Sequence, residues 1–155
     1  MRDKRFKAVH RGGSLSREQH CQLIKWAREC SEHILGLFGN NIDNRLYHAL
    51  VVAREWEKGN VSAGIARKAS LDAIAVANES SDPAAIAVAR SIGHAVATAH
   101  MADHSLGAAL YALKAVKNIG KSVDAELKWQ NNQLPLDIKE LVLTARKAKK
   151  FEIIL

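Results

Sequence analysis

The chain has 155 residues, of which 48% are hydrophobic, 25% charged and 5% aromatic, and its 23 Lys and Arg against 16 Asp and Glu give a net charge of +7. This balance is typical of a globular protein and excludes disorder. No run of 18 apolar residues is present, which excludes a membrane channel, and the charged opening has no apolar stretch behind it of the kind a signal peptide needs. We therefore expect one helical domain over residues 1–155 that acts in the cytoplasm and contacts no membrane.

Helix signals recur along the chain with almost no competing strand signals. Ser16 and Gln19 make a capping box, and Pro83 after Asp82 is the strongest helix start, because proline at the first helical position has no N–H to leave unpaired. In chain order, helices are expected from Ser16 to Gly36–Gly39, Asp43 to Gly59, Ser62 onward, Asp82 to a break at Asp103–Ser105, Leu106 to Gly120, Ser122 to before Pro135, and Pro135 to Lys149. The pattern predicts an all-α fold, a single compact bundle of six to seven helices.

Alanine marks the centre of this bundle. Most alanines fall between Ala63 and Ala115, in the third to fifth expected helices. Because alanine favours helix and adds little bulk, neighbouring axes can approach at the short end of the usual ~8–10 Å range. We expect an Ala-rich central set with tight helix contacts at Ala95 and Ala99. The two cysteines, Cys21 and Cys30, lie on opposite sides of one helix and are expected to be free thiols.

The densest polar cluster in the sequence is His94, His100, Asp103 and His104. On one helix His100 and His104 share a face and, with Asp103, have the residue types and spacing of a zinc site, but His94 lies ~240° around the helix from His100. We expect that Asp103 caps the fifth helix and that the histidines make hydrogen bonds between packed helices, with no metal and no cofactor. The sequence leaves open whether the cluster binds a metal.

Catalytic motifs are missing from the sequence. Glu55 and Glu57 point to different sides of their helix, no Gly-x-Ser-x-Gly is present, and Gly12 and Gly13 lack the spacing of a phosphate-binding loop. We expect no enzymatic activity.

Positive charge concentrates at the two ends of the chain. One end is a basic N-terminal segment over residues 1–14, and the other is the run Arg146, Lys147, Lys149 and Lys150. These runs raise the alternative of a basic nucleic-acid-binding helical module. Nucleic acid is the weaker interpretation, since no aromatic platform, zinc finger or helix-turn-helix accompanies them.

The stretch Ala66–Lys117 contains the segments Ala-Arg-Lys-Ala-Ser-Leu, Ala-Asn-Glu-Ser-Ser-Asp-Pro and His-Met-Ala-Asp-His-Ser-Leu-Gly-Ala-Ala-Leu-Tyr-Ala-Leu-Lys-Ala. With these segments, the opening Met-Arg-Asp-Lys-Arg-Phe and the later Lys-Trp-Gln-Asn-Asn-Gln-Leu-Pro, the chain resembles the all-α immunity proteins of bacterial polymorphic-toxin systems over nearly its whole length. The resemblance implies that the chain binds and neutralises a cognate toxin, and it transfers no catalytic residue.

Charge narrows the expected partner further. Inhibitors of nucleases commonly present acidic surfaces, because they cover a basic nucleic-acid groove and complementary potential speeds docking. A chain at +7 has the opposite charge. We expect a toxin that is acidic at its contact face, or one that acts on something other than nucleic acid.

A mixed face of the fourth helix is the predicted contact surface. Arg90, His94, Thr98 and Met101 recur at helical spacing opposite the apolar stripe, and polar residues follow at the end of the helix. The predicted partner-binding residues are Arg90, His94, His100, Asp103 and His104. The alternative is that this face packs under the terminal helices, and the sequence also leaves a homo-oligomer open.

Overall fold

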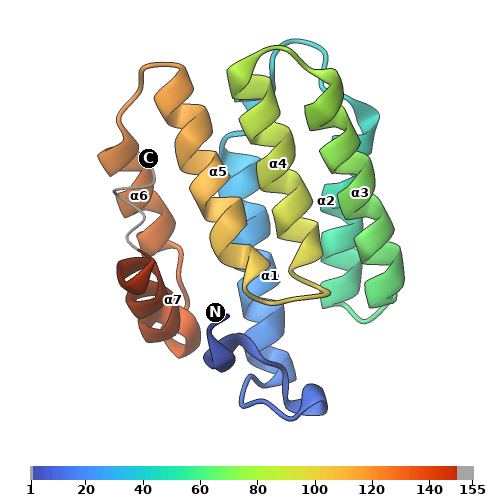
Figure 1. Cartoon of the computed structure of the whole chain (residues 1–155), viewed down its shortest axis with the longest axis vertical. Helices are drawn as coiled ribbons and strands as arrows, with labels where there is room; N and C mark the ends of the chain where they lie inside the picture. Colours follow the sequence, from blue (N-terminus) through green and yellow to red (C-terminus); the bar gives the residue numbers. More distant parts are fainter. Residues whose placement is uncertain (1, 150–155) are drawn as a thin grey trace.

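The computed structural model describes residues 2–149, so Lys150 of the expected basic run lies outside the described residues. In this part of the chain there are seven α-helices and three short 3-10 turns at Lys4–Phe6, Val9–Arg11 and Leu35–Phe38 (Figure 1). The helices are α1 Arg17–His33, α2 Asn44–Glu57, α3 Ala63–Glu79, α4 Pro83–Ala97, α5 His104–Asn118, α6 Val123–Asn132 and α7 Leu136–Ala148. The predicted all-α bundle of six to seven helices is confirmed.

Side-chain caps begin most helices where the sequence predicted. Ser16 accepts a hydrogen bond from the Gln19 N–H at 3.1 Å, and the Gln19 side chain accepts from the Ser16 N–H at 3.0 Å, which completes the capping box. Asp82 accepts from the Ala85 N–H at 3.1 Å, with Pro83 at the first helical position. Similar caps are made by Asp43, Ser62 and Ser122. Each cap satisfies a backbone N–H that has no partner within its helix, which is why these local patterns locate the helix starts.

Helix α4 packs between α3 and α5, and α1 packs against both α4 and α5 (Figure 1). Ala27, Ala95 and Ala108 meet where α1, α4 and α5 come together, and all three are fully buried. At the same crossing, the Ser91 hydroxyl donates to the Ala108 carbonyl at 2.8 Å. The Ser31 hydroxyl lies 2.8 Å from the Ser91 hydroxyl and donates to it, because the Ser91 proton is already used. Small side chains therefore bring these helices close enough for one hydroxyl to reach the backbone of the next helix.

A second apolar core joins the N-terminal segment to α1, α5 and α7. Phe6, Trp26, Leu106 and Ile138 belong to it. The Trp26 indole N–H donates to the Gln130 carbonyl at 2.8 Å, so the ring also ties α1 to α6. This core positions the residues that precede α1, which form one wall of the site described below.

The break between α4 and α5 lies earlier than the sequence predicted. Helix α4 ends at Ala97 and α5 begins at His104, whereas the predicted break was at Asp103–Ser105. The Thr98 carbonyl, which would accept from the backbone in a continuing helix, instead accepts from the His20 Nε2 atom at 2.6 Å. A residue on α1, 78 residues away in sequence, thus pairs with the carbonyl just past the helix end, and no local pattern encodes this contact.

The thiols Cys21 and Cys30 are free and lie on α1, as predicted. None of the helices in residues 2–149 is long and apolar enough to cross a membrane.

Candidate functional site

The basic N-terminal segment is folded onto the bundle. Phe6 and Leu15 are buried, and the chain between them closes on itself through hydrogen bonds from the Leu15 N–H to the Lys7 carbonyl and from the Val9 N–H to the Leu15 carbonyl, at 3.0 and 2.9 Å. Gly13 permits this closure, because a Cβ atom at that position would lie 2.1 Å from the Lys7 carbonyl oxygen. The residues before α1 therefore hold a defined shape against the helices.

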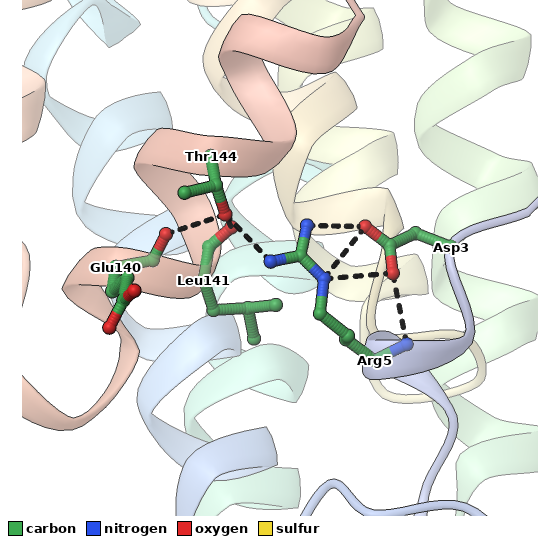
Figure 2. A network of polar contacts seen from close by, with 5 residues as sticks. All are labelled: Asp3, Arg5, Glu140, Leu141 and Thr144. Carbon is green, nitrogen blue, oxygen red and sulfur yellow. Dashed lines mark hydrogen bonds and ion pairs between the residues drawn. The ribbon is translucent and has the colours of Figure 1, made fainter.

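Arg5 fastens this segment to α7, as Figure 2 shows. Its guanidinium donates to the Thr144 hydroxyl at 2.6 Å and to both carboxylate oxygens of Asp3, at 2.7 to 3.1 Å. Asp3 also accepts from the Arg5 backbone N–H at 3.0 Å. These hydrogen bonds hold the pKa of the Asp3 carboxyl below its usual range, so Asp3 is ionised and its charge is already balanced by Arg5.

A pocket of about 440 Å³ opens between the N-terminal segment and the helices. Its other walls are the start of α1, the end of α2, the start of α3 and the turn between α4 and α5. The apolar part of the lining comprises Phe6, Ala8, Trp56, Ala63, Ala99, Met101 and Ala102. The volume is typical of sites that enclose a small ligand or a few side chains.

One side of this pocket is built on Trp56. The Arg17 guanidinium lies 3.9 Å from the centre of the indole ring and donates to the Trp56 carbonyl at 3.0 Å. The His20 ring lies 4.7 Å from the indole, measured between ring centres. Burial lowers the pKa of His20, so its ring is neutral at pH 7 and carries the Nε2 proton that it donates to the Thr98 carbonyl. Arg17 is therefore held in place as a fixed cation at the pocket.

Positive charge dominates the pocket lining. Five Lys and Arg side chains line it, Arg2, Lys4, Lys7, Arg11 and Arg17, against the two carboxylates of Asp3 and Asp103. Because both oxygens of Asp3 accept hydrogen bonds from Arg5, Asp103 is the carboxylate that faces these cations. The potential in the pocket therefore favours an anionic group.

Asp103 does not cap α5, which corrects the sequence prediction. It occupies the position before His104, but its backbone is in the right-handed helical region and its side chain makes no capping hydrogen bond. Its carboxylate instead lies 3.5 Å from the Arg2 guanidinium, which also contacts the Met101 sulfur. Asp103 thus faces across the pocket toward the N-terminal segment.

The five predicted partner-binding residues separate into two groups. His100 and Asp103 line the pocket. Arg90, His94 and His104 belong to the interface between α4 and α5, where Arg90 is the exposed member and its guanidinium lies 5.8 Å from the centre of the Tyr111 ring. Thr98, which the sequence placed on the same exposed face, is fully buried.

His94 is packed closely on three sides. Its Nδ1 atom lies 3.1 Å from that of His104, its ring stacks on Tyr111 with centres 5.2 Å apart, and Gly107 lies against its face. Burial, followed by the neighbouring His104, lowers the pKa of His94 to about 4, and burial also lowers the pKa of His104. Both rings are neutral at pH 7, so one Nδ1 carries the proton and donates to the other.

Sequence reasoning missed Arg17, His20 and Trp56 as site residues. Arg17 and His20 stand three residues apart in the first turn of α1, a spacing that puts them on neighbouring positions of one face. That is the only local signal, because Trp56 ends α2 and meets them only in the folded chain. In residues 2–149, no group of three or more His, Cys, Asp and Glu side chains is arranged to hold a metal ion.

Comparison with known proteins gives one family. The model of the family described as "Imm-5 like putative immunity protein" matches residues 13–137 of this chain, which is more than half of it. The same comparisons find no similar curated protein and no similar solved structure. The matched span runs from the end of the N-terminal segment to the start of α7 and contains Arg17, His20, Trp56 and Asp103.

Proposed function

The chain belongs to the Imm-5 like putative immunity protein family, and from this premise we propose that it binds a cognate bacterial toxin and neutralises it by non-covalent contact. The family match carries this proposal. Binding to a toxin requires no catalytic group, and the proposal assigns the chain neither an enzymatic activity nor a cofactor. The reactive side chains of the described residues have structural roles that fit this assignment: Cys30 is buried in the core, His20 donates to the Thr98 carbonyl, and on α1 the His33 Nδ1 atom lies 2.6 Å from a carboxylate oxygen of Glu126 on α6.

The proposed contact surface is the basic pocket with its rim. Lys4, Lys7, Arg11 and Arg17 are all exposed there, and Arg17 is held against Trp56. A toxin that presents acidic residues at its contact face would be attracted from a distance and oriented on approach. His100 and Asp103 belong to this surface.

Arg90, His94 and His104 have a second role in the proposal. Arg90 is exposed on α4 and is proposed as a contact at the edge of the surface, while His94 and His104 support the turn that carries His100 and Asp103. The encounter is proposed to take place in the cytoplasm, where free thiols such as Cys21 and Cys30 stay reduced.

A nucleic-acid-binding module is the competing function. Single-stranded nucleic acid is usually held by bases stacked on open aromatic faces. Here Arg17 and His20 lie against Trp56, and the Trp129 ring stacks on His33 with centres 3.5 Å apart. These contacts favour a protein partner over nucleic acid.

The test of the function is protection of cells. The neighbouring open reading frame is examined for a large secreted protein with a toxic C-terminal domain, and that domain is expressed in a susceptible bacterium with and without this chain. Growth restored by the chain, together with co-purification of the two proteins, supports the proposal. Continued killing despite full expression of both proteins contradicts it. A gel retardation assay at two salt concentrations tests the competing function, since tight binding at physiological salt that weakens steeply with salt is the behaviour of a phosphate-contacting protein.

A further inference from the structure

We propose that the pocket binds an acidic side chain of a protein partner together with the apolar side chain beside it, and that Asp103 takes the place of the partner's carboxylate in the free protein. The inference rests on the proposed function for the existence of a protein partner. It goes further by naming the chemistry of the bound segment and the residue that competes with it.

The charge of the lining supplies the first argument. Asp3 is saturated by Arg5, so five cations at the pocket face a single remaining carboxylate, that of Asp103. The closest of them to Asp103 is Arg2, at 3.5 Å, and the Arg2 side chain is 55% exposed. A pair that is long, and in which Arg2 is more than half exposed, is weak, so an incoming carboxylate can compete with Asp103 for Arg2 at little cost.

The position of Asp103 supplies the second argument. Asp and Ser at the starts of α1, α2, α3, α4 and α6 cap their helices, whereas Asp103 leaves the α5 start uncapped by a side chain. Its side chain is only 13% exposed and is directed to the N-terminal segment. The Asp103 carboxylate thus lies among the cations of the pocket, and it does not make the capping hydrogen bond that an aspartate at a helix N-terminus ordinarily makes.

The apolar walls distinguish this ligand from a free anion. Phe6, Trp56, Ala99 and Ala102 line the same pocket as the cations. These four side chains are only 3–5% exposed, so each offers little open surface; an aliphatic or aromatic side chain next to the carboxylate would cover what remains, which an inorganic phosphate would not do. The combination of a fixed cation and an apolar wall selects an amphipathic peptide segment over an anion alone.

The experiment measures binding of short peptides by amide chemical shifts in the full chain labelled with ¹⁵N. The probe is acetyl-Leu-Glu-Leu-amide, and its matched control is acetyl-Leu-Gln-Leu-amide. We expect saturable shifts confined to the pocket, at residues 2–20, Trp56, Ala63 and residues 99–103, with affinity about twofold to fivefold higher for the Glu peptide, in line with one exposed ionic contact. Equal affinity for the Gln peptide, or shifts spread over the whole surface, would overturn the proposal.

Asp103→Asn tests the competing carboxylate. Because Asp103 makes no capping bond, the variant should fold, and a dispersed spectrum verifies that it does. It should bind the Glu peptide about twofold to fivefold more tightly than the wild type, since removal of a weak ionic competitor is worth a few-fold. Asp124→Asn on α6 makes the same change of net charge away from the pocket and is the control. An equal gain in the control would show that net charge alone acts and would refute the role of Asp103.

Inorganic phosphate and a 12-base-pair DNA duplex are titrated in parallel. If either shifts the same amides at lower concentration than the Glu peptide does, the site recognises phosphate and the proposal is wrong. The peptide results are independent of the toxin. If the peptide binds but substitutions in the pocket do not affect protection against the toxin, this inference stands and the toxin contact lies elsewhere. If substitutions in the pocket abolish protection but the peptide does not bind, the proposed function stands and this inference is overturned.

Discussion

Substitution of Gly107 by alanine should weaken the fold through His94. A Cβ atom added at Gly107 would lie 2.6 Å from the His94 Nδ1 atom and 2.9 Å from its Cγ atom, closer than real Cβ atoms approach. The ring cannot easily move away, because Tyr111 stacks on it and His104 pairs with it. Overpacking of this kind costs about 1–3 kcal/mol of stability, whereas replacing glycine by alanine in a helix interior stabilises the helix by roughly 1 kcal/mol. We expect a net loss of up to about 2 kcal/mol in the free energy of unfolding.

Urea unfolding followed by circular dichroism measures this change, with Gly64→Ala as the control. A Cβ at Gly64, in the first turn of α3, meets only the Ser62 hydroxyl at 3.6 Å, so this variant should be equal to or slightly more stable than the wild type. In a His94→Ala background the penalty of Gly107→Ala should disappear. The reasoning is refuted if Gly107→Ala stabilises the protein as much as the control does, or if its effect is the same with and without His94.

Two further predictions concern pH and helix packing. Because His94 has a pKa of about 4 in the folded protein, below the ~6.5 of an exposed histidine, the unfolded chain binds more protons between these values, and stability should fall by about 1–3 kcal/mol as pH drops from 6.5 toward 4. Urea midpoints at pH 7 and pH 5 check this, and His94→Gln should show a smaller difference; an unchanged difference would contradict it. Ala95→Leu, at the fully buried contact of α1, α4 and α5, should cost about 1–3 kcal/mol, whereas Ala125→Leu on the exposed side of α6 should cost little. Equal thermal midpoints for these two variants would exclude a tight contact at Ala95.

The helix starts could be predicted because each depends on residues within one turn. Ser16 and Asp82 accept from backbone N–H groups three residues away, and Pro83 at the first helical position has no N–H to leave unpaired. The end of α4 could not be predicted, since the carbonyl just past it pairs with the distant His20. The cap expected from Asp103 failed for a related reason: its carboxylate is directed to Arg2, 101 residues earlier in the chain. Local hydrogen bonding is readable from sequence, and competition from distant partners is not.

The site was only partly predictable. The sequence pointed to a positive N-terminal segment, but it gave no reason to expect that segment to fold back and form the wall of a pocket. That depends on burial of Phe6 and on the bond from Arg5 to Thr144. The prediction of one continuous face from Arg90 to Met101 assumed an unbroken helix, and the turn after Ala97 divides that face in two.

The most direct test of the central claim is the affinity of the purified toxin domain for charge-reversed variants. Lys7→Glu combined with Arg11→Glu reverses two exposed cations at the pocket, and Lys128→Glu combined with Lys147→Glu makes the same change of net charge on α6 and α7. Calorimetry at physiological salt should show a Kd raised at least about tenfold by the pocket pair and about threefold or less by the distant pair, because close charges govern affinity and distant ones are screened. Equal effects of the two pairs, or wild-type affinity in the pocket pair, would contradict the claim that the basic pocket receives an acidic surface of the toxin.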